Sequence, residues 1–312
     1  STPTFFRVSS VPLNEMLMSQ IVRSLDHQDH RLRRRMLESL IERSDGRSVL
    51  EDLSKRANPR RARVASITGL GVLATRGDSE AQRALIRLIR DDDENIRLAV
   101  YRALGQCTAR PVRGLFRVIE RGLGDVSPPV RTAACLALGG FGNPDAAELY
   151  LELSRHWGEV FPHLRHGIVV GLAQCGNHEA LMEGALDNEF AVRMVCCLAL
   201  ERLGRNEMAY FLTDTEDARL VAEAARVLYV KGELNHLSVL AGMLKQGSAS
   251  FGYPQALRDV IHRRSLAANS VLGRTEHAAA IVDFLKNDQS AGELKQLAAE
   301  LLSQWGERQR VD

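Results

Sequence analysis

The stretch DDENIRLAVYRALG, residues 92–105, decides the fold of this chain. An apolar residue stands directly before Arg97, apolar residues follow it three and four positions later, and Leu104 lies seven positions after it. Side chains with these spacings share one face of an α-helix. Asp93, four residues before Arg97, belongs to a residue type that caps helix N-termini and interacts favourably with the helix dipole. The stretch therefore predicts one capped, amphipathic helix.

The same pattern recurs along the chain, which indicates a repeat architecture. We call the residue equivalent to Arg97 in each copy, clear or weak, a ladder position. The ladder positions are Arg33, Arg63, Arg97, Arg131, Arg165, Arg193, Val221, Ser265 and Lys295. Successive ladder positions are 28 to 44 residues apart, which is the length of a helical hairpin.

Second amphipathic stretches lie between the copies, for example residues 80–90 and 145–157, and complete these hairpins. One hairpin cannot bury its apolar face alone and has to stack on its neighbours. The sequence therefore predicts an all-α fold, a right-handed α-solenoid of about nine hairpins. We expect an entering segment at residues 1–12, a single solenoid over residues 13–312, and an insertion near residues 246–254.

The pattern resembles that of HEAT-like repeat proteins of the short type, over about residues 13 to 306. A narrower resemblance concerns the C-terminal part, which is similar to the HEAT region of PVC-type haem-binding proteins. The stretches that carry it are VAEAAR (221–226), RRSLAAN (263–269), LG (272–273), LLSQW (301–305) and RQRV (308–311). Those proteins are large exported chains with a sugar-dehydrogenase-like propeller and a c-type cytochrome.

This narrower resemblance implies an interaction or spacer module of an exported redox assembly, located in the periplasm or outside the cell. The present chain has no CxxCH motif, so no electron-transfer residue carries over. It begins with Ser1 and shows no basic-then-apolar leader, and we expect a processed protein or an excised segment.

Composition excludes several classes of protein. The chain is 45% hydrophobic and 26% charged, which excludes disordered and collagen-like chains. Its net charge of +2 gives no reason for long-range capture of nucleic acid or of a membrane surface. No apolar run approaches the length that a membrane-spanning helix needs.

No motif predicts catalysis, a cofactor or a metal. The GLGVLA stretch at residues 69–74 matches the dinucleotide fingerprint in letters but lies at the end of a predicted helix, not after a strand. His156, His163 and His166 lack an acidic or cysteine partner at a zinc-site spacing. The five cysteines occupy apolar helix positions, where thiols are inert core residues. We therefore expect a non-enzymatic protein.

Two surfaces are candidate interaction sites. The first is a basic patch in the first two repeats, able to meet an acidic protein surface or a phosphate backbone; it comprises Arg31, Arg34, Arg35, Arg60 and Arg61. The second is a concave face, to which positions two, five and nine past the ladder residue point on a helical wheel. Its apolar residues are Leu136, Val170, Val195 and Leu198, and its flanking arginines are Arg102, Arg202 and Arg226.

We therefore expect a monomeric protein-interaction or spacer module, whose partner is another protein or a neighbouring domain of a larger parent chain. Two alternatives stay open. A HEAT-like DNA glycosylase would bind nucleic acid, but it needs an aromatic and acidic constellation in its groove, and Trp157 and Trp305 do not provide one. A HEAT-like bilin lyase subunit would require a partner that handles the chromophore.

Overall fold

Every regular element in the described part of the chain is helical, which confirms the all-α prediction. The computed structural model describes residues 16–108, 111–157, 160–205, 217–244, 253–287 and 292–308. Contacts divide the chain into two compact units, Ser1–Asn177 and His178–Asp312. The predicted entering segment, most of the predicted insertion and the end of the RQRV stretch lie outside the described residues. The number of hairpins, their handedness and the single-solenoid organisation stay predictions.

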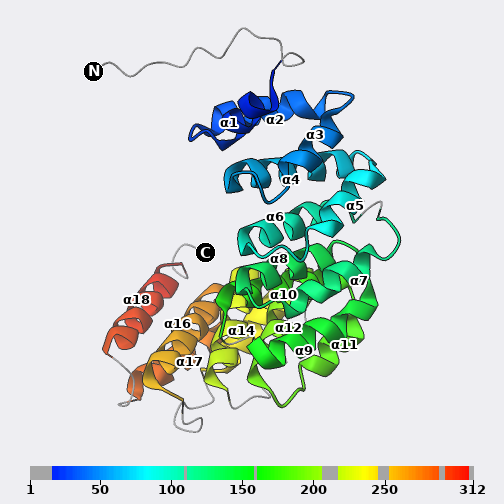
Figure 1. Cartoon of the computed structure of the whole chain (residues 1–312). Helices are drawn as coiled ribbons and strands as arrows, with labels where there is room; N and C mark the ends of the chain where they lie inside the picture. Colours follow the sequence, from blue (N-terminus) through cyan, green and yellow to red (C-terminus); the bar gives the residue numbers. More distant parts are fainter. Residues whose placement is uncertain are drawn as a thin grey trace, which may run out of the picture. The chain divides into compact units, whose positions relative to one another are not determined.

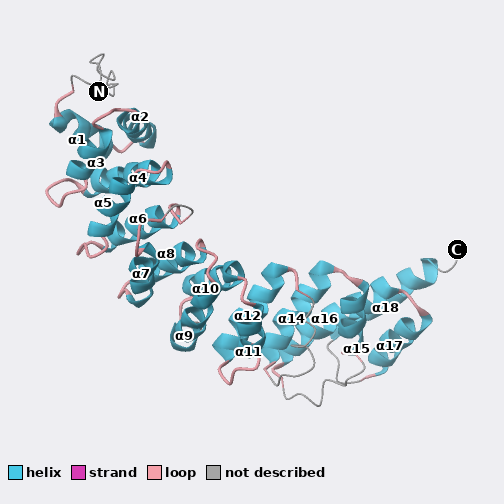
Figure 2. Cartoon of the chain, turned by 90° about the vertical axis from the view of Figure 1, so that its right-hand side faces the viewer, coloured by secondary structure: helices cyan, strands magenta, loops and turns pink. Residues whose placement is uncertain are grey.

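The first unit consists of two rows of helices (Figure 1, Figure 2). Its helices are α1 (Met18–Asp26), α2 (His30–Ile41), α3 (Gly46–Leu53), α4 (Arg60–Thr75), α5 (Ser79–Arg87), α6 (Glu94–Gly105), α7 (Leu115–Glu120), α8 (Pro128–Gly139), α9 (Ala147–Trp157) and α10 (Pro162–Cys175), with the 3-10 helices η2 (Arg121–Gly124) and η3 (Pro144–Ala146). Helices α2, α4, α6, α8 and α10 carry the ladder positions and pack side by side in chain order. We call α3, α5, α7 and α9, which pack against them, the companion helices.

The second unit repeats this arrangement. Its helices are α11 (His178–Gly184), α12 (Phe190–Leu203), α14 (Ala218–Lys231), α15 (Leu234–Gly242), α16 (Gln255–Leu272), α17 (Thr275–Lys286) and α18 (Gly292–Arg308). Helices α12, α14, α16 and α18 carry the ladder positions and pack in that order, while α17 packs against both α16 and α18. In neither unit is a described helix both long enough and apolar enough to cross a membrane.

Helix ends follow local chemistry. The side chains of Asp93, the predicted cap, and of the equivalent Asp29 and Asp217 accept hydrogen bonds from backbone N–H groups in the first turns of α6, α2 and α14. These bonds satisfy donors that have no partner inside the helix. At the other end, Gly204 and Gly232 follow α12 and α14 with positive φ, a conformation that glycine adopts without steric cost.

The apolar positions seven residues past the ladder form the core, as the sequence predicts. Leu104, Leu138 and Leu200 are completely buried, and Leu172 is buried as well. Leu272, near the end of α16, is only half-buried. Small residues between these leucines let neighbouring helices approach closely: a Cβ atom added to Gly105 would lie 2.9 Å from the Cβ atom of Ala137.

The GLGVLA stretch has the same structural explanation. It lies inside α4, and a Cβ atom on Gly71 would lie 2.9 Å from the Cβ atom of Ala103 on α6. Gly71 therefore serves the packing of α4 against α6, and the stretch lies near the end of a helix, as the sequence predicts.

The ladder arginines tie each repeat to the loop that precedes its own helix. The Nη1 atom of Arg97 donates to the carbonyl oxygens of Asp91 at 2.8 Å and Asp92 at 3.2 Å, six and five residues earlier. Arg33, Arg131 and Arg193 donate to the equivalent two carbonyls of their own repeats. Loop carbonyls that would otherwise lack a partner are satisfied in this way.

The same guanidinium also reaches the next repeat. Arg97 binds the carboxylate of Asp125 through two hydrogen bonds of 2.8 and 2.9 Å, the forked geometry that arginine and carboxylate favour. Arg63 donates likewise to the carboxylate of Asp91 and to the carbonyl oxygen of Ser54. Asp91 and Asp125 occupy equivalent loop positions, so the contact recurs from one repeat to the next.

Charge and burial oppose each other at Asp125. Burial by itself raises the pKa of this carboxyl, but the hydrogen bonds from Arg97 and from the backbone N–H of Ser127 outweigh burial and lower the pKa below its ordinary value. The folded state therefore favours the carboxylate. Its contribution to stability is present above the pKa of about 3.9 for an unfolded aspartate, and it is lost as pH falls through the lower folded pKa.

Replacing Leu138 with Ala should destabilise the protein by roughly 2–5 kcal/mol, because the change leaves a cavity in a completely buried site. Leu136→Ala on the same helix is the matched control; its side chain is 41% exposed, and it should cost less than about 1 kcal/mol. Urea unfolding of both variants measures the difference. Equal losses would show that the side of α8 assigned to the core is wrong.

Asp125→Asn should destabilise the protein at pH 7 by about 1.5–3 kcal/mol, the contribution of hydrogen bonds to a charged group. The difference from the parent should shrink as pH falls below about 4, because the parent then loses the same charge. Unfolding free energies at pH 7 and pH 3 test this. Asp92→Asn, a change to an exposed carboxylate in the preceding repeat, is the control; a pH-independent difference for Asp125→Asn would contradict the assignment.

Candidate functional site

The predicted concave strip is only partly exposed. Leu136 is 41% exposed and Leu198 is half-buried, but Val170 and Val195 are buried, at 8% and 0%. The prediction that these two valines face solvent is wrong. A helix inside a stack contacts a neighbour on each side as well as a companion helix, so a wider arc of its surface is buried than a single amphipathic wheel assumes.

The flanking arginines differ in their surroundings. Arg102 on α6 and Arg202 on α12 are exposed. Arg226 on α14 is half-buried between two carboxylates, at 2.7 Å from Glu223 and 3.0 Å from Glu201. These ion pairs and hydrogen bonds raise the pKa of Arg226, so this side chain holds α14 to α12.

The predicted basic patch is a solvated surface. All five of its side chains are exposed; they are Arg31, Arg34, Arg35, Arg60 and Arg61. Arg34 pairs with Glu38 at 2.7 Å and Arg60 pairs with Asp93 at 2.6 Å, so part of the positive charge is already compensated. Arg63, in contrast, is 6% exposed and belongs to the buried ladder.

The histidines singled out in the sequence and the cysteines differ in exposure. His156, His163 and His166 are all exposed, and the described ranges contain no group of three or more potential metal-binding side chains. All five cysteines are buried. Burial raises the pKa of the Cys107, Cys135 and Cys197 thiols, and it raises the pKa of Cys175 to about 11.

An apolar cluster surrounds one ladder arginine in the first unit. The guanidinium carbon of Arg131 lies 4.6 Å from the ring centre of Trp157 and 5.4 Å from that of Phe161. Arg131 also donates to the carbonyl oxygens of Asp125 and Val126. We call Val126, Arg131, Trp157, Val160 and Phe161 the Arg131 cluster.

Three members of this cluster are exposed to solvent. Val126 is 87% exposed, Val160 is 61% exposed and Trp157 is 38% exposed. Arg131 beneath them is only 5% exposed, and its cation–π contacts restrain the aromatic rings. Single exposed apolar residues are ordinary on a protein surface, whereas several gathered together mark an interaction site.

Sequence reasoning missed this cluster, although a signal for it exists. Val126 and Val160 both stand five residues before a ladder arginine. At that position the other arginine-bearing repeats have a polar residue, namely Gln28, Asn58, Asp92 and Asn188. Two consecutive repeats therefore replace a polar loop residue with valine, and the packing of α8 against α10 brings both loops to the same arginine.

No protein-family model and no curated protein matches this sequence, but solved structures share its fold. Kap121p is 11% identical, with a TM-score of 0.52 over 91% of this chain and 37% of Kap121p. A HEAT-like repeats protein from the archaeon Thermococcus onnurineus is 16% identical, with a TM-score of 0.41 over 72% of this chain and 98% of that one. The CpcE–CpcF complex of phycocyanin lyase from Nostoc is 13% identical, with a TM-score of 0.38, covering 98% and 100% of the two chains.

At these identities the comparisons show the fold alone. The chain has an all-α fold of stacked helices, in agreement with the predicted helical repeats. The narrower resemblance to PVC-type haem-binding proteins finds no support in them.

Thiol reactivity tests the assignment of the cysteines. At pH 8 the native protein should react slowly with a thiol reagent, because burial raises the thiol pKa values and only the thiolate attacks. All five thiols should react rapidly in denaturant. A thiol that reacts within seconds in the native state would identify an accessible, activated cysteine instead.

Proposed function

We propose that this chain is a non-enzymatic protein-interaction module, and that the Arg131 cluster is the place where a protein partner docks apolar side chains. The observation that carries this proposal is that Trp157 lies against the buried guanidinium of Arg131. The exposed valines Val126 and Val160 stand in the two loops that reach this arginine. Tryptophan and arginine are the residue types that dominate interface energetics. Arg131 holds the loop that presents Val126, so little order has to be gained there on binding.

The buried charged groups support an architectural role. Arg63 and Arg97 are engaged with loop carbonyls and with Asp91 and Asp125, contacts that fix the spacing of repeats. The candidate interaction functions differ in the identity of the partner. The resemblance to PVC-type proteins would make it a neighbouring domain of the same parent chain, and a bilin-lyase role would make it a second subunit that handles the chromophore.

Charge introduced into the cluster should abolish this binding. The double variant Val126→Asp and Val160→Asp should fold, since both side chains are exposed. Its affinity for the interacting protein should fall at least tenfold, about 1.4 kcal/mol. Cross-linking in a native extract, followed by quantification of the same cross-linked partner, measures the loss. Val230→Asp, at a 70% exposed valine of the second unit, is the control.

Two results would contradict the proposal. One is a folded double variant that retains its cross-linked partner while the control loses it. The other is a turnover of substrate by the purified protein that survives the double substitution, which would make the chain an enzyme.

A further inference from the structure

The two units carry opposite net charges. Residues 1–177 contain 26 Lys and Arg against 20 Asp and Glu, a net charge of +6. Residues 178–312 contain 15 against 19, a net charge of −4. The net charge of the whole chain is near zero although the first unit is basic. The positions of the unpaired basic side chains in this unit indicate what kind of ligand it binds.

The ladder lines up the C-terminal ends of the companion helices in this unit. Arg63 bonds to Ser54, directly after α3, and to Asp91, after α5. Arg97 bonds to Asp91 and to Asp125, after α7 and η2. Three consecutive chain segments that leave companion helices are thus tied together in order by the guanidinium groups of Arg63 and Arg97.

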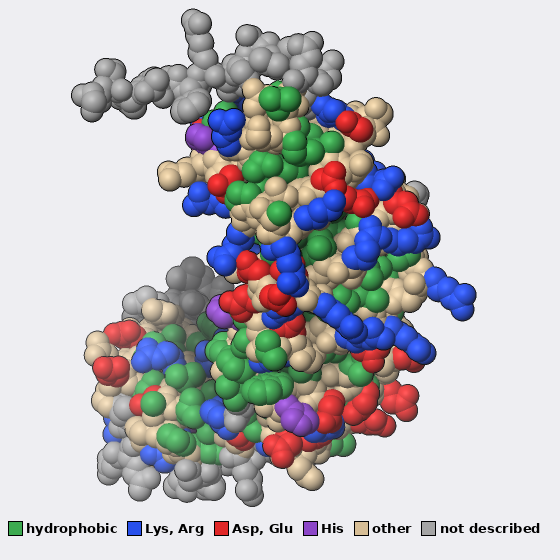
Figure 3. All heavy atoms as spheres, in the orientation of Figure 1, with side chains coloured by type: hydrophobic (Ala, Val, Ile, Leu, Met, Phe, Trp, Pro, Cys, Tyr) green, Lys and Arg blue, Asp and Glu red, His purple; other side chains and the backbone are tan. Residues whose placement is uncertain are grey.

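Each of these three helix ends presents two exposed basic side chains. They are Lys55 and Arg56 after α3, Arg87 and Arg90 at the end of α5, and Arg117 and Arg121 at the end of α7. We call these six residues the outer basic row. Figure 3 shows lysine and arginine side chains gathered along the side of the first unit where α5 and α7 lie.

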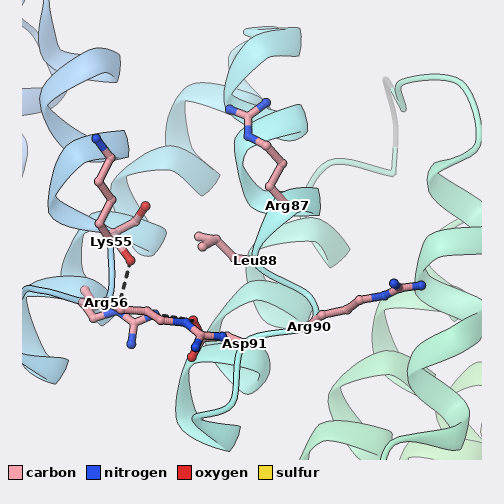
Figure 4. A pocket seen from close by; sticks show the side chains of 8 residues that line it. Lys55, Arg56, Arg87, Leu88, Arg90 and Asp91 are labelled. Carbon is pink, nitrogen blue, oxygen red and sulfur yellow. Dashed lines mark hydrogen bonds and ion pairs between the residues drawn. The ribbon is translucent and has the colours of Figure 1, made fainter.

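A pocket lies between the first two pairs of the row. It encloses about 270 Å³ and is lined by Ser54, Lys55, Arg56, Arg63, Arg87, Leu88, Arg90 and Asp91. Figure 4 shows Lys55 and Arg56 on one side of it, Arg87 and Leu88 on the other, and Arg90 extending away from them. The single carboxylate of the lining, Asp91, is engaged by the buried Arg63.

Much of the charge in the row is available to a ligand. Arg90, Arg117 and Arg121 form no ion pair with any residue in the described ranges. Lys55, Arg56 and Arg87 pair with Asp52, Asp92 and Glu51 respectively, across exposed contacts. Exposed ion pairs contribute about 0–1 kcal/mol, so a ligand carboxylate can replace these partners at small cost.

We propose that the outer basic row binds an acidic, extended segment of a protein partner, with carboxylates about three residues apart. The ladder helices α4, α6 and α8 pack on one another in this order, and packed helices lie about 8–10 Å apart. A chain in the extended polyproline II conformation rises about 3.1 Å per residue and completes one turn in three residues, so every third side chain points to the same side. Successive acidic side chains at every third position therefore meet successive pairs of the row. Arginine guanidinium groups bind such carboxylates through two parallel hydrogen bonds.

The pattern of charge favours such a segment over nucleic acid. Asp52, Asp92 and Glu120 lie among the basic residues, so the row alternates in sign. Duplex DNA carries a charge about every 1.7 Å along its axis, and its phosphates would meet these carboxylates. A peptide whose acidic residues are spaced avoids that repulsion.

This inference rests on the proposed function, protein binding, and extends it to a second surface of the same unit. The Arg131 cluster begins at Val126, five residues after Arg121 in the chain. A partner segment that is acidic at one end and apolar at the other matches both features.

Two labelled peptides of identical composition test the proposal with the full chain. One has aspartate at every third position in a Ser-rich chain, and the other has the same aspartates in one block. Fluorescence anisotropy at about 0.15 M salt should show at least fivefold tighter binding of the spaced peptide. The double variant Arg90→Ser and Arg117→Ser should weaken it at least tenfold. Arg34→Ser and Arg35→Ser, which remove the same charge from exposed positions on α2, should leave it unchanged.

Each other outcome overturns the proposal. An equal loss of affinity for the spaced peptide in the two double variants would show that net charge alone attracts it. If the parent protein does not bind the spaced peptide, the outer basic row is not a binding site. Tight DNA binding with a steep salt dependence that Arg90→Ser and Arg117→Ser flatten would make the row a nucleic-acid surface. Self-association lost in that variant would make the acidic unit of a second copy the occupant. None of these results depends on the Val126 and Val160 variant, so the two proposals fail separately.

Discussion

The first unit depends on a partly buried arginine that bonds backward to its own loop and forward to the next repeat. Arg97 satisfies two carbonyls of the loop before α6 and, with the rest of its guanidinium group, the carboxylate of Asp125 in the following loop. Burying both charges is costly unless every polar group finds a partner. The forked guanidinium provides those partners. Because it contacts the loops of two successive repeats, it fixes the position of one repeat relative to the next.

The contact also explains where function can reside. Hydrogen bonds of the ladder hold the loops between companion and ladder helices in place, so side chains on these loops are presented in a fixed order. One stretch presents basic pairs after α3, α5 and α7, and the adjoining stretch presents Val126, Trp157 and Val160 around Arg131. The ladder changes in the second unit, where two of its positions are Val221 and Ser265, both completely buried. A site built on several consecutive arginine-held loops therefore belongs to the first unit.

Most of the fold and little of the candidate site could be predicted from the sequence. The spacing of Arg97 and Leu104 gives the helix, and its recurrence gives the stack, because burial of a periodic apolar face depends on local order alone. The same reasoning failed at Val170 and Val195, since their burial depends on what neighbouring helices cover. The sequence shows that Val126 and Val160 replace a polar loop residue. Only the structure shows that Trp157 lies next to Arg131, and therefore that the two valines belong to a surface cluster.

Sequence by itself determined the all-α class, the ladder positions, the aspartate caps and the buried leucines, because each depends on residues within one turn or one repeat. Tertiary structure alone decided which charges meet. Arg63 finds Asp91 and Arg97 finds Asp125 across 28 residues each, and these pairings place three helix ends in one row. A charge's effect depends on distance and burial, and both are properties of the packed chain, so the function of an exposed arginine such as Arg90 could not be distinguished from that of Arg34 before the helices were in place.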